Sequence, residues 1–258
     1  MKAIGIILAG GNNNRMKELT AKRAVPALPV AGSFRSIDFA LSSMSNSHIQ
    51  TVAVLTQYNA RSLNEHLSSS KWWNFGRKQG GLFLFTPTVT ADNSDWYRGT
   101  ADAMYQNIDF LKRRHEPYVI ISSGDCVYKL DFNRVLDFHI EKKSDITVVC
   151  KDMMYNDDVS RFGVVRMDDE SRITEFDEKP IEASSNTTMS ERSRASRSRS
   201  PKYRCTVPGV WLRMLSRLAT MSGAAPVAVK ARAPAAKASP KRCAALPVGA
   251  QHTIRGAR

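Results

Sequence analysis

The sequence predicts an α/β fold built on a mainly parallel sheet with helices on both faces. Three observations predict it: short apolar runs suited to buried strands, stretches between them with apolar residues at helical spacing, and small or polar residues directly after the runs. This alternation extends over residues 3–150. In such a sheet the carboxyl ends of the strands share one edge, where ligands bind.

The first element is a strand over residues 3–8 that runs into a turn of small residues. Ala9, Gly10 and Gly11 carry little or no side chain, so a phosphate can approach their main-chain N–H groups. Arg15, at the expected start of a helix, would add a fixed positive charge. An ordinary strand-to-helix turn has the same pattern, and this alternative stays open. The stretch GGNNNR lacks the later glycines of a dinucleotide fingerprint and the Gly-Lys-Ser/Thr of a P-loop, which disfavours both classes.

A second strand follows after one helix. Residues 17–29 form a polar, proline-containing segment that is expected to cross the ligand edge, and they include Lys22. Apolar residues recur at helical spacing over residues 36–44, and residues 51–56 form the next strand. Gln57 comes directly after this strand, at the same edge of the sheet.

The middle of the chain is predicted to hold a helix over residues 61–67 and a strand over residues 82–85. Trp72 and Trp73 lie between them. We interpret both as packing anchors, with ligand stacking as the weaker alternative.

A long amphipathic helix is predicted to begin at Gly99 and Thr100. Its first N–H groups, beside the Thr100 hydroxyl, suit a sugar or phosphate oxygen, although an ordinary helix start has the same features. The residues expected on its buried face are Ala101, Met104, Ile108 and Leu111.

The next strand, over residues 118–123, ends in Gly124 and Asp125. A carboxylate at that edge can hold Mg²⁺ against phosphate oxygens, and an aspartate that caps the following turn is the alternative. A helix over 130–142, a strand over 146–150 and a hairpin of 162–167 with 172–176 complete the elements. After the hairpin, Lys179 is available for a phosphate.

Composition disfavours several other classes of protein. The four cysteines and five histidines are widely spaced, without the paired spacing of a zinc site or a disulfide framework. No apolar run approaches the length of about 20 residues that spans a membrane, and the first residues show no signal-peptide pattern. We therefore expect a soluble cytoplasmic protein with reduced thiols.

The net charge of +14 belongs to one part of the chain. Residues 188–258 hold 15 of the 38 Lys and Arg residues and one of the 24 Asp and Glu residues, so residues 1–187 carry 23 of each. The second part is rich in Arg and Ser and then in Ala, Pro and Lys, a composition that buries little apolar surface. We expect a domain over residues 1–187 and a disordered basic tail over residues 188–258.

Eight ordered segments closely resemble the glucose-1-phosphate adenylyltransferases of bacterial glycogen synthesis. They are AGGNNNR, TAKRAVPAL, RSIDFALSSMSNS, VLTQY, WYRGTADAMYQNIDF, SGDCVYKLD, SRFG and EFDEKP. The resemblance extends from residue 3 to about residue 187. It implies a three-layer, Rossmann-like nucleotidyltransferase fold, incomplete here, and the Mg²⁺-dependent reaction of ATP with α-glucose 1-phosphate to ADP-glucose and diphosphate.

The resemblance also implies roles for residues at the strand ends. Asp125 matches the aspartate that holds the metal, and Arg15 matches the arginine of the loop that holds the ATP phosphates, so both are predicted to be catalytic. The positions that match this loop or the nucleotide and sugar pocket are Gly10, Gly11, Gln57, Gly99 and Thr100. The positions that match the substrate motifs are Tyr97, Glu178 and Lys179, and the position that matches an activator site is Lys22.

Three departures from the family pattern affect the predicted activity. Asn13 replaces a glycine of the phosphate loop, Cys126 replaces a histidine after Asp125, and Val25 replaces the lysine of catalytic members. This pattern resembles the regulatory-type second subunit of some Gram-positive bacteria, which acts beside a catalytic subunit in a mixed tetramer. We therefore expect a regulatory role with weak catalysis.

The tail has two interpretations. Clustered arginines and serines suit RNA or another polyanion, so a nucleic-acid-binding protein is the alternative function. The favoured interpretation is a shifted reading frame, because the change in composition falls inside the family's catalytic domain rather than at a domain boundary. A nucleotidyltransferase for another sugar phosphate or nucleotide is a third alternative.

Overall fold

Strand β1 (Ala3–Ala9) lies inside the sheet, with an apolar core on each of its faces. Ile7 packs in one core, whereas Ile4 and Ile6 pack in the other. A strand between two apolar layers presents no side chain to water, which explains its continuous apolar run. The predicted first strand is therefore confirmed.

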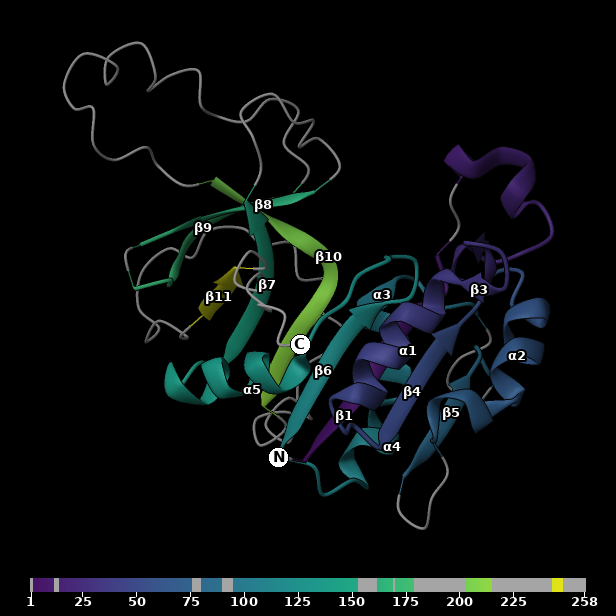
Figure 1. The fold of residues 1–258 in the computed structure, drawn as a ribbon, viewed down its shortest axis with the longest axis horizontal. Coiled ribbons are helices and arrows are strands. Elements are labelled where there is room, and N and C mark those ends of the chain that lie inside the picture. The colour runs from purple at the N-terminus through teal and green to yellow at the C-terminus, as the bar shows by residue number, and fades with distance from the viewer. Residues whose placement is uncertain are drawn as a thin grey trace, which may run out of the picture.

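The computed structural model is organised around this sheet (Figure 1). It describes residues 2–11, 14–75, 80–89, 95–152, 162–168, 170–178, 203–214 and 243–247. Four parallel strands lie in the order β6, β1, β4, β5. Their bounds beyond β1 are Thr51–Thr56 for β4, Gly81–Phe85 for β5 and Tyr118–Ser123 for β6. The predicted parallel α/β architecture is confirmed.

Helices cover both faces of this sheet, which gives three layers (Figure 1). On one face lie α1 (Ser36–Asn46), α2 (Arg61–Ser68) and α5 (Phe132–Glu141), and on the other lie α3 (Thr100–Gln106) and α4 (Ile108–Lys112). Each layer buries one apolar stripe against the strands. Among the described residues, no helix combines the length and the apolar character that crossing a membrane requires.

The long helix predicted after Gly99 is two helices in the structure. Asn107 leaves helical geometry, with φ −104° and ψ 16°. Its amide donates to the carbonyl of Ala103 at 2.8 Å and to the hydroxyl of Tyr97 at 3.0 Å. A short polar side chain that bonds to nearby groups in this way competes with the helical backbone pattern, so α3 ends and α4 begins here.

The buried face of this helix pair also differs from the prediction. Ala103 and Leu111 are buried, Met104 and Ile108 are half-buried, and Ala101 is exposed. The break at Asn107 interrupts the 3.6-residue repeat of apolar residues. A single repeat extended over both helices therefore does not identify the residues that pack on the sheet.

The two tryptophans have different environments. Trp73 is 6% exposed, accepts a hydrogen bond from Ser45 at its carbonyl and contacts the His66 ring edge to face, so it is a packing anchor. Trp72 is 80% exposed, and its interpretation as an anchor is wrong. The short elements are β2 (Pro29–Val30), β3 (Phe34–Arg35) and the 3₁₀ helices Asn14–Thr20, Val25–Ala27 and Ser70–Trp73.

The remaining strands extend the sheet beyond β6. They are β7 (Ile146–Asp152), β8 (Gly163–Met167), β9 (Ile173–Glu178), β10 (Tyr203–Met214) and β11 (Cys243–Pro247). β10 lies antiparallel between β6 and β7, and β11 lies parallel to β7. β8 and β9 form the predicted hairpin, and β8 also pairs with β10.

Two segments of the tail are therefore strands, whereas the sequence predicts disorder for the whole tail. β10 occupies the position between β6 and β7, where the backbone groups of both strands need hydrogen-bond partners. Residues 203–214 include Tyr, Val, Trp and Leu, which favour strands. The average composition of residues 188–258 does not reveal this short strand-forming segment.

Candidate functional site

Three strand ends meet at the carboxyl edge of the sheet. Parallel pairing places Ala9 of β1 opposite Thr56 of β4, and Leu8 of β1 opposite Ser123 of β6. The loops that follow these strands therefore begin side by side.

The loop after β1 contacts the loops on either side of it. A methyl group added at Gly10 would lie 3.1 Å from Cβ of Gln57, so the glycine allows the two loops to approach closely. On the other side, the N–H of Gly124 donates to the carbonyl of Leu8 at 3.0 Å. Gly11 is exposed, and a methyl group added there would meet no atom within 4 Å. Within the predicted phosphate loop, Gly11 thus presents bare main chain at an open surface.

Gln57 connects this edge to the segment before α3. Its Nε2 donates to the carbonyl of Tyr97 at 3.4 Å. Tyr97 itself is buried and accepts a hydrogen bond from Asn107 at its hydroxyl. Burial raises the pKa of the Tyr97 hydroxyl, the charge of Asp102 adds to the rise, and the bond from Asn107 opposes it. The hydroxyl is therefore neutral at physiological pH.

The start of α3 lies after this anchored tyrosine. Gly99 has φ +153° and is exposed, as is Thr100. The carboxylate of Asp102 accepts the N–H of Arg98 at 2.8 Å, which fixes the entry of the chain into the helix. Gly99 and Thr100 thus follow Tyr97, whose carbonyl accepts a hydrogen bond from Gln57, by two and three residues in the chain.

Asp125 follows β6 and its side chain is exposed. Its Oδ1 accepts hydrogen bonds from the Ser123 hydroxyl and, at 3.4 Å, from the Cys126 thiol. Burial raises the pKa of the Cys126 thiol to about 12, and the charge of Asp125 adds to this rise. The thiol therefore stays protonated and keeps donating to the carboxylate.

The donor set at this edge fits a hard cation that also binds phosphate. No three His, Cys, Asp or Glu side chains gather into a metal cluster anywhere in the described part of the chain. Mg²⁺ needs only one or two protein carboxylates when substrate phosphates and waters supply its other ligands. The exposed carboxylate of Asp125 could supply such a ligand.

The turn that carries Val25 lies against the same edge. A methyl group added at Gly124 would lie 3.4 Å from Cβ of Pro26, so the proline packs directly beside the residue that precedes Asp125. The N–H of Ala24 donates to the carbonyl of Asn59, in the loop after β4, at 3.3 Å. Position 25 is therefore held next to the carboxyl edge at which β1, β4 and β6 end.

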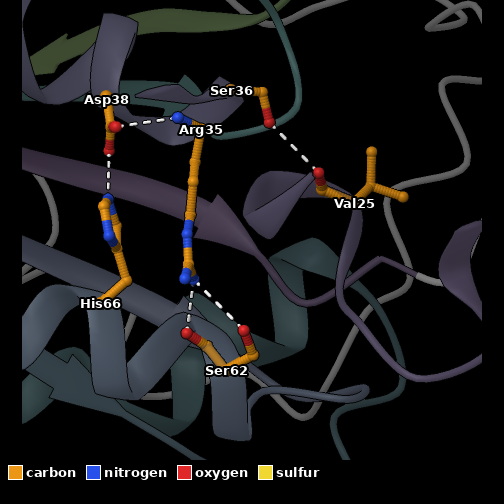
Figure 2. Close-up of polar contacts among 6 residues, drawn as sticks. All are labelled: Val25, Arg35, Ser36, Asp38, Ser62 and His66. Atoms are coloured by element: carbon orange, nitrogen blue, oxygen red, sulfur yellow. Dashed lines mark hydrogen bonds and ion pairs between the residues drawn. The ribbon is translucent and has the colours of Figure 1, made fainter. Parts of the chain in front are cut away.

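A polar network anchors this turn to the start of α1 (Figure 2). The Ser36 hydroxyl donates to the carbonyl of Val25 at 3.1 Å. Beside it, the carboxylate of Asp38 accepts the N–H of Arg35 at 2.8 Å and Nε2–H of His66 at 2.7 Å. The Arg35 guanidinium donates to the carbonyl and hydroxyl oxygens of Ser62 in α2.

No described contact joins Arg15, Lys22, Glu178 or Lys179 to this edge of the sheet. The backbone of Arg15 lies in the 3₁₀ helix Asn14–Thr20, and its side chain lies outside the described atoms. Lys22 is exposed in the bend before the Val25 turn. Glu178 is exposed at the end of β9, in the hairpin that joins the sheet through the pairing of β8 with β10 (Figure 1). Lys179 lies outside the described residues.

Sequence reasoning missed the partners that orient the site. Ser123 carries no motif of its own, and its hydroxyl is assigned to Asp125 only by the structure. Tyr58 and Trp96 stack with ring centroids 5.6 Å apart and planes inclined by 14°, beside Gln57 and Tyr97. Each aromatic residue directly adjoins a predicted site residue, and that adjacency is the signal that could have identified them.

A cavity of about 640 Å³ lies elsewhere, between β5 and the α3–α4 pair. Its walls are Phe83, Phe85, Gln106, Asn107, Asp109, Phe110, Arg113 and Arg114. None of the predicted site residues lines it. The candidate site is instead the carboxyl edge of the sheet, because the loops that carry Gly10, Gln57 and Asp125 contact one another there.

The family model described as nucleotidyl transferase matches residues 4–191, which is more than half of the chain. The chain belongs to the nucleotidyl transferase family. The nucleotidyl transferase match includes every predicted site residue from Gly10 to Lys179 and ends before β10.

Curated relatives are similar over the same part of this nucleotidyl transferase. Glucose-1-phosphate adenylyltransferase of Clostridium novyi (strain NT) is 44% identical over 183 residues, which are 71% of this chain and 48% of that protein. The enzyme of that name from Geobacillus stearothermophilus is 40% identical over 185 residues, or 72% and 48%. The one from Lachnospira eligens is 44% identical over 183 residues, or 71% and 43%. The chain spans about half the length of these relatives.

Proposed function

We propose that this nucleotidyl transferase takes ATP and α-glucose 1-phosphate as substrates and serves the synthesis of ADP-glucose for glycogen in the cytoplasm. The observation that carries the proposal is the common edge at which the Gly10–Gly11 loop, Gln57 and Asp125 meet. The identity of 40–44% to glucose-1-phosphate adenylyltransferases supports the choice of substrates.

In the proposed reaction, a phosphate oxygen of glucose 1-phosphate attacks the α-phosphorus of ATP, and diphosphate leaves. Such in-line transfer depends on positioning and charge neutralisation rather than on a covalent nucleophile. Mg²⁺ held by Asp125 would neutralise charge on the phosphate oxygens. The residues proposed to hold the triphosphate are Gly10, Gly11 and Arg15, those for the nucleotide and sugar are Gln57, Gly99 and Thr100, and those for the sugar phosphate are Tyr97, Glu178 and Lys179.

We further propose that catalysis is weak and that the protein regulates a catalytic subunit in a mixed tetramer. The turn that carries Val25 lies beside the sheet edge that leads to Asp125, and an apolar residue occupies the position that matches the lysine of catalytic family members. The absence of one such cation in a water-poor site costs several kcal/mol, or on the order of a hundredfold in rate. Lys22, exposed near this turn, is the proposed effector contact.

An ADP-glucose assay with and without a catalytic subunit tests these proposals. We expect little product from the chain alone, about a hundredfold more from the Val25→Lys variant, and a changed effector response when the catalytic subunit is added. Val25→Met is the matched control, because it lengthens the side chain without adding charge. Turnover by the unmodified chain at the rate of a catalytic subunit would contradict the regulatory role.

We also propose that residues 188–258 are read in a non-native frame. The end of the family match at residue 191 supports this, because the relatives continue for about as long again. Translating the neighbouring frame of the gene tests it: family sequence after residue 186 is expected, and its absence would refute the shift. A version with the restored frame is then the protein for the assay with a catalytic subunit.

A further inference from the structure

The carbonyl of Val25 has two hydrogen-bond donors from different parts of the chain. Leu28 donates its N–H at 3.0 Å, which closes the 3₁₀ turn, and Ser36 donates its hydroxyl at 3.1 Å from the first turn of α1. The side chain of Val25 extends away from Ser36 (Figure 2). A hydrogen bond to this carbonyl therefore also constrains where the side chain at position 25 can lie.

Ser36 is itself rigidly placed. It is 5% exposed, and its N–H donates to the carbonyl of Leu28 at 3.2 Å. The preceding residue, Arg35, is bonded through its N–H to Asp38 and through its guanidinium to Ser62. Helices α1 and α2 thus fix the hydroxyl that the turn binds.

The turn has one further support on the side of the sheet edge. Pro26 is buried and packs against Gly124, directly before Asp125. Because the main chain on both sides of position 25 is held, the turn has a defined place beside the sheet edge that leads to Asp125. A displacement of about 1 Å near reacting groups can cost on the order of a hundredfold in rate.

We propose that Ser36 is a positioning residue that fixes the turn, and thereby the side chain at position 25, beside the proposed phosphate site at the sheet edge. The inference rests on the proposed function, since a nucleotide must bind at that edge for the position to matter. Ser36 contacts no substrate in this scheme and acts through the Val25 carbonyl.

A double-mutant cycle of ATP affinity tests the coupling between the two positions. Calorimetric titration of ATP is expected to give at least fivefold tighter binding for Val25→Lys, and Ser36→Ala is expected to remove most of that gain. Ser36→Thr, which keeps a hydroxyl, is expected to retain it. If Ser36→Ala changes the ATP affinity equally in the unmodified protein and in Val25→Lys, the inference is overturned. It is also overturned if ATP binds but Val25→Lys does not bind it more tightly.

Amide hydrogen exchange tests the positioning without a nucleotide. Ser36→Ala is expected to speed exchange in the peptide covering residues 24–28 about fivefold, whereas Ser36→Thr leaves it slow. Ser45→Ala is the matched control, because it removes a hydroxyl on the same helix that donates to Trp73 instead. Unchanged exchange in Ser36→Ala overturns the inference whatever ATP does. If Ser36→Ala speeds exchange but the protein binds no ATP, the result supports Ser36 as the anchor of the turn. Only the proposed function is then contradicted.

Discussion

At the scale of single residues, Gly80 occupies a position that excludes a side chain for two independent reasons. Its φ is +115°, a conformation that residues with a Cβ atom rarely adopt. A methyl group there would also lie 2.5 Å from the carbonyl oxygen of Gln50. That oxygen accepts the N–H of Gly81 at 3.0 Å, so it cannot move away without loss of a hydrogen bond.

We expect Gly80→Ala to lower the free energy of unfolding by about 2–4 kcal/mol, measured by urea denaturation. Gly32→Ala is the control, because Gly32 has φ +88° but a methyl group there would meet no atom within 4 Å. Gly32→Ala is expected to lower the free energy of unfolding by about 1 kcal/mol, from backbone strain alone. Equal losses for the two variants would show that the contact with Gln50 contributes nothing.

Asp38 is the residue on which the network at the start of α1 depends. It is 7% exposed and accepts hydrogen bonds from Arg35 and His66. Asp38→Ala leaves two donors without partners, so we expect a loss of about 2–4 kcal/mol in the free energy of unfolding. Asp38→Asn retains one acceptor oxygen, and its loss is expected to be smaller. A loss below about 0.5 kcal/mol for Asp38→Ala in thermal denaturation would show that water replaces the carboxylate.

At the scale of elements, the strands could be predicted because burial on both faces leaves a continuous apolar run, as in β1 and β4. The location of Gln57 and Asp125 at one edge of the sheet could also be predicted from the sequence, since parallel strands point the same way. The break at Asn107 could not be predicted, because it depends on a hydrogen bond to Tyr97 in the preceding loop. Likewise, the periodicity of the sequence does not predict the hydrogen bond from Ser36 to Val25, because this bond joins two different elements.

The packing of α5 on β7 makes stability depend on pH. His139 of α5 is 2% exposed, and its Nδ1 bonds to the hydroxyl of Thr147 in β7 at 2.8 Å. Burial lowers the pKa of His139 below its ordinary value of 6.5, and the charge of Asp145 opposes this only in part. The unfolded chain therefore takes up a proton at a higher pH than the folded chain does, and stability falls as the pH drops below about 6.5.

We expect the double variant His139→Leu, Thr147→Val to lose less stability than the unmodified chain between pH 7 and pH 5. Removing both partners avoids leaving a single buried polar group unsatisfied. Chemical denaturation at several pH values measures the effect, and the exposed His115 supplies a control in His115→Leu, which should keep the original pH dependence. Identical pH profiles for the double variant and the unmodified chain would contradict the assignment to His139.

At the scale of the whole molecule, β10 connects two parts of the sheet. Among the described strands, β6 and β7 pair with β10 and not with each other, so the parallel strands β6, β1, β4 and β5 are joined to β7 through it. Within β10, the register shifts between Thr206 and Trp211, and Pro208 lies in this interval. A proline is tolerated at such an irregularity because no regular ladder bond is required there.

Leu212 lies where β10 pairs on both sides, opposite Ile120 of β6 and Thr147 of β7. We expect Leu212→Pro to lower the free energy of unfolding by about 3 kcal/mol or more, because a proline inside a central strand removes a ladder donor. Pro208→Ala is the control and should change it by less than about 1 kcal/mol. Urea unfolding followed by circular dichroism measures both. If Leu212→Pro unfolds like the unmodified chain, the sheet is stable without β10, and the pairing of β10 with β6 and β7 contributes nothing to stability.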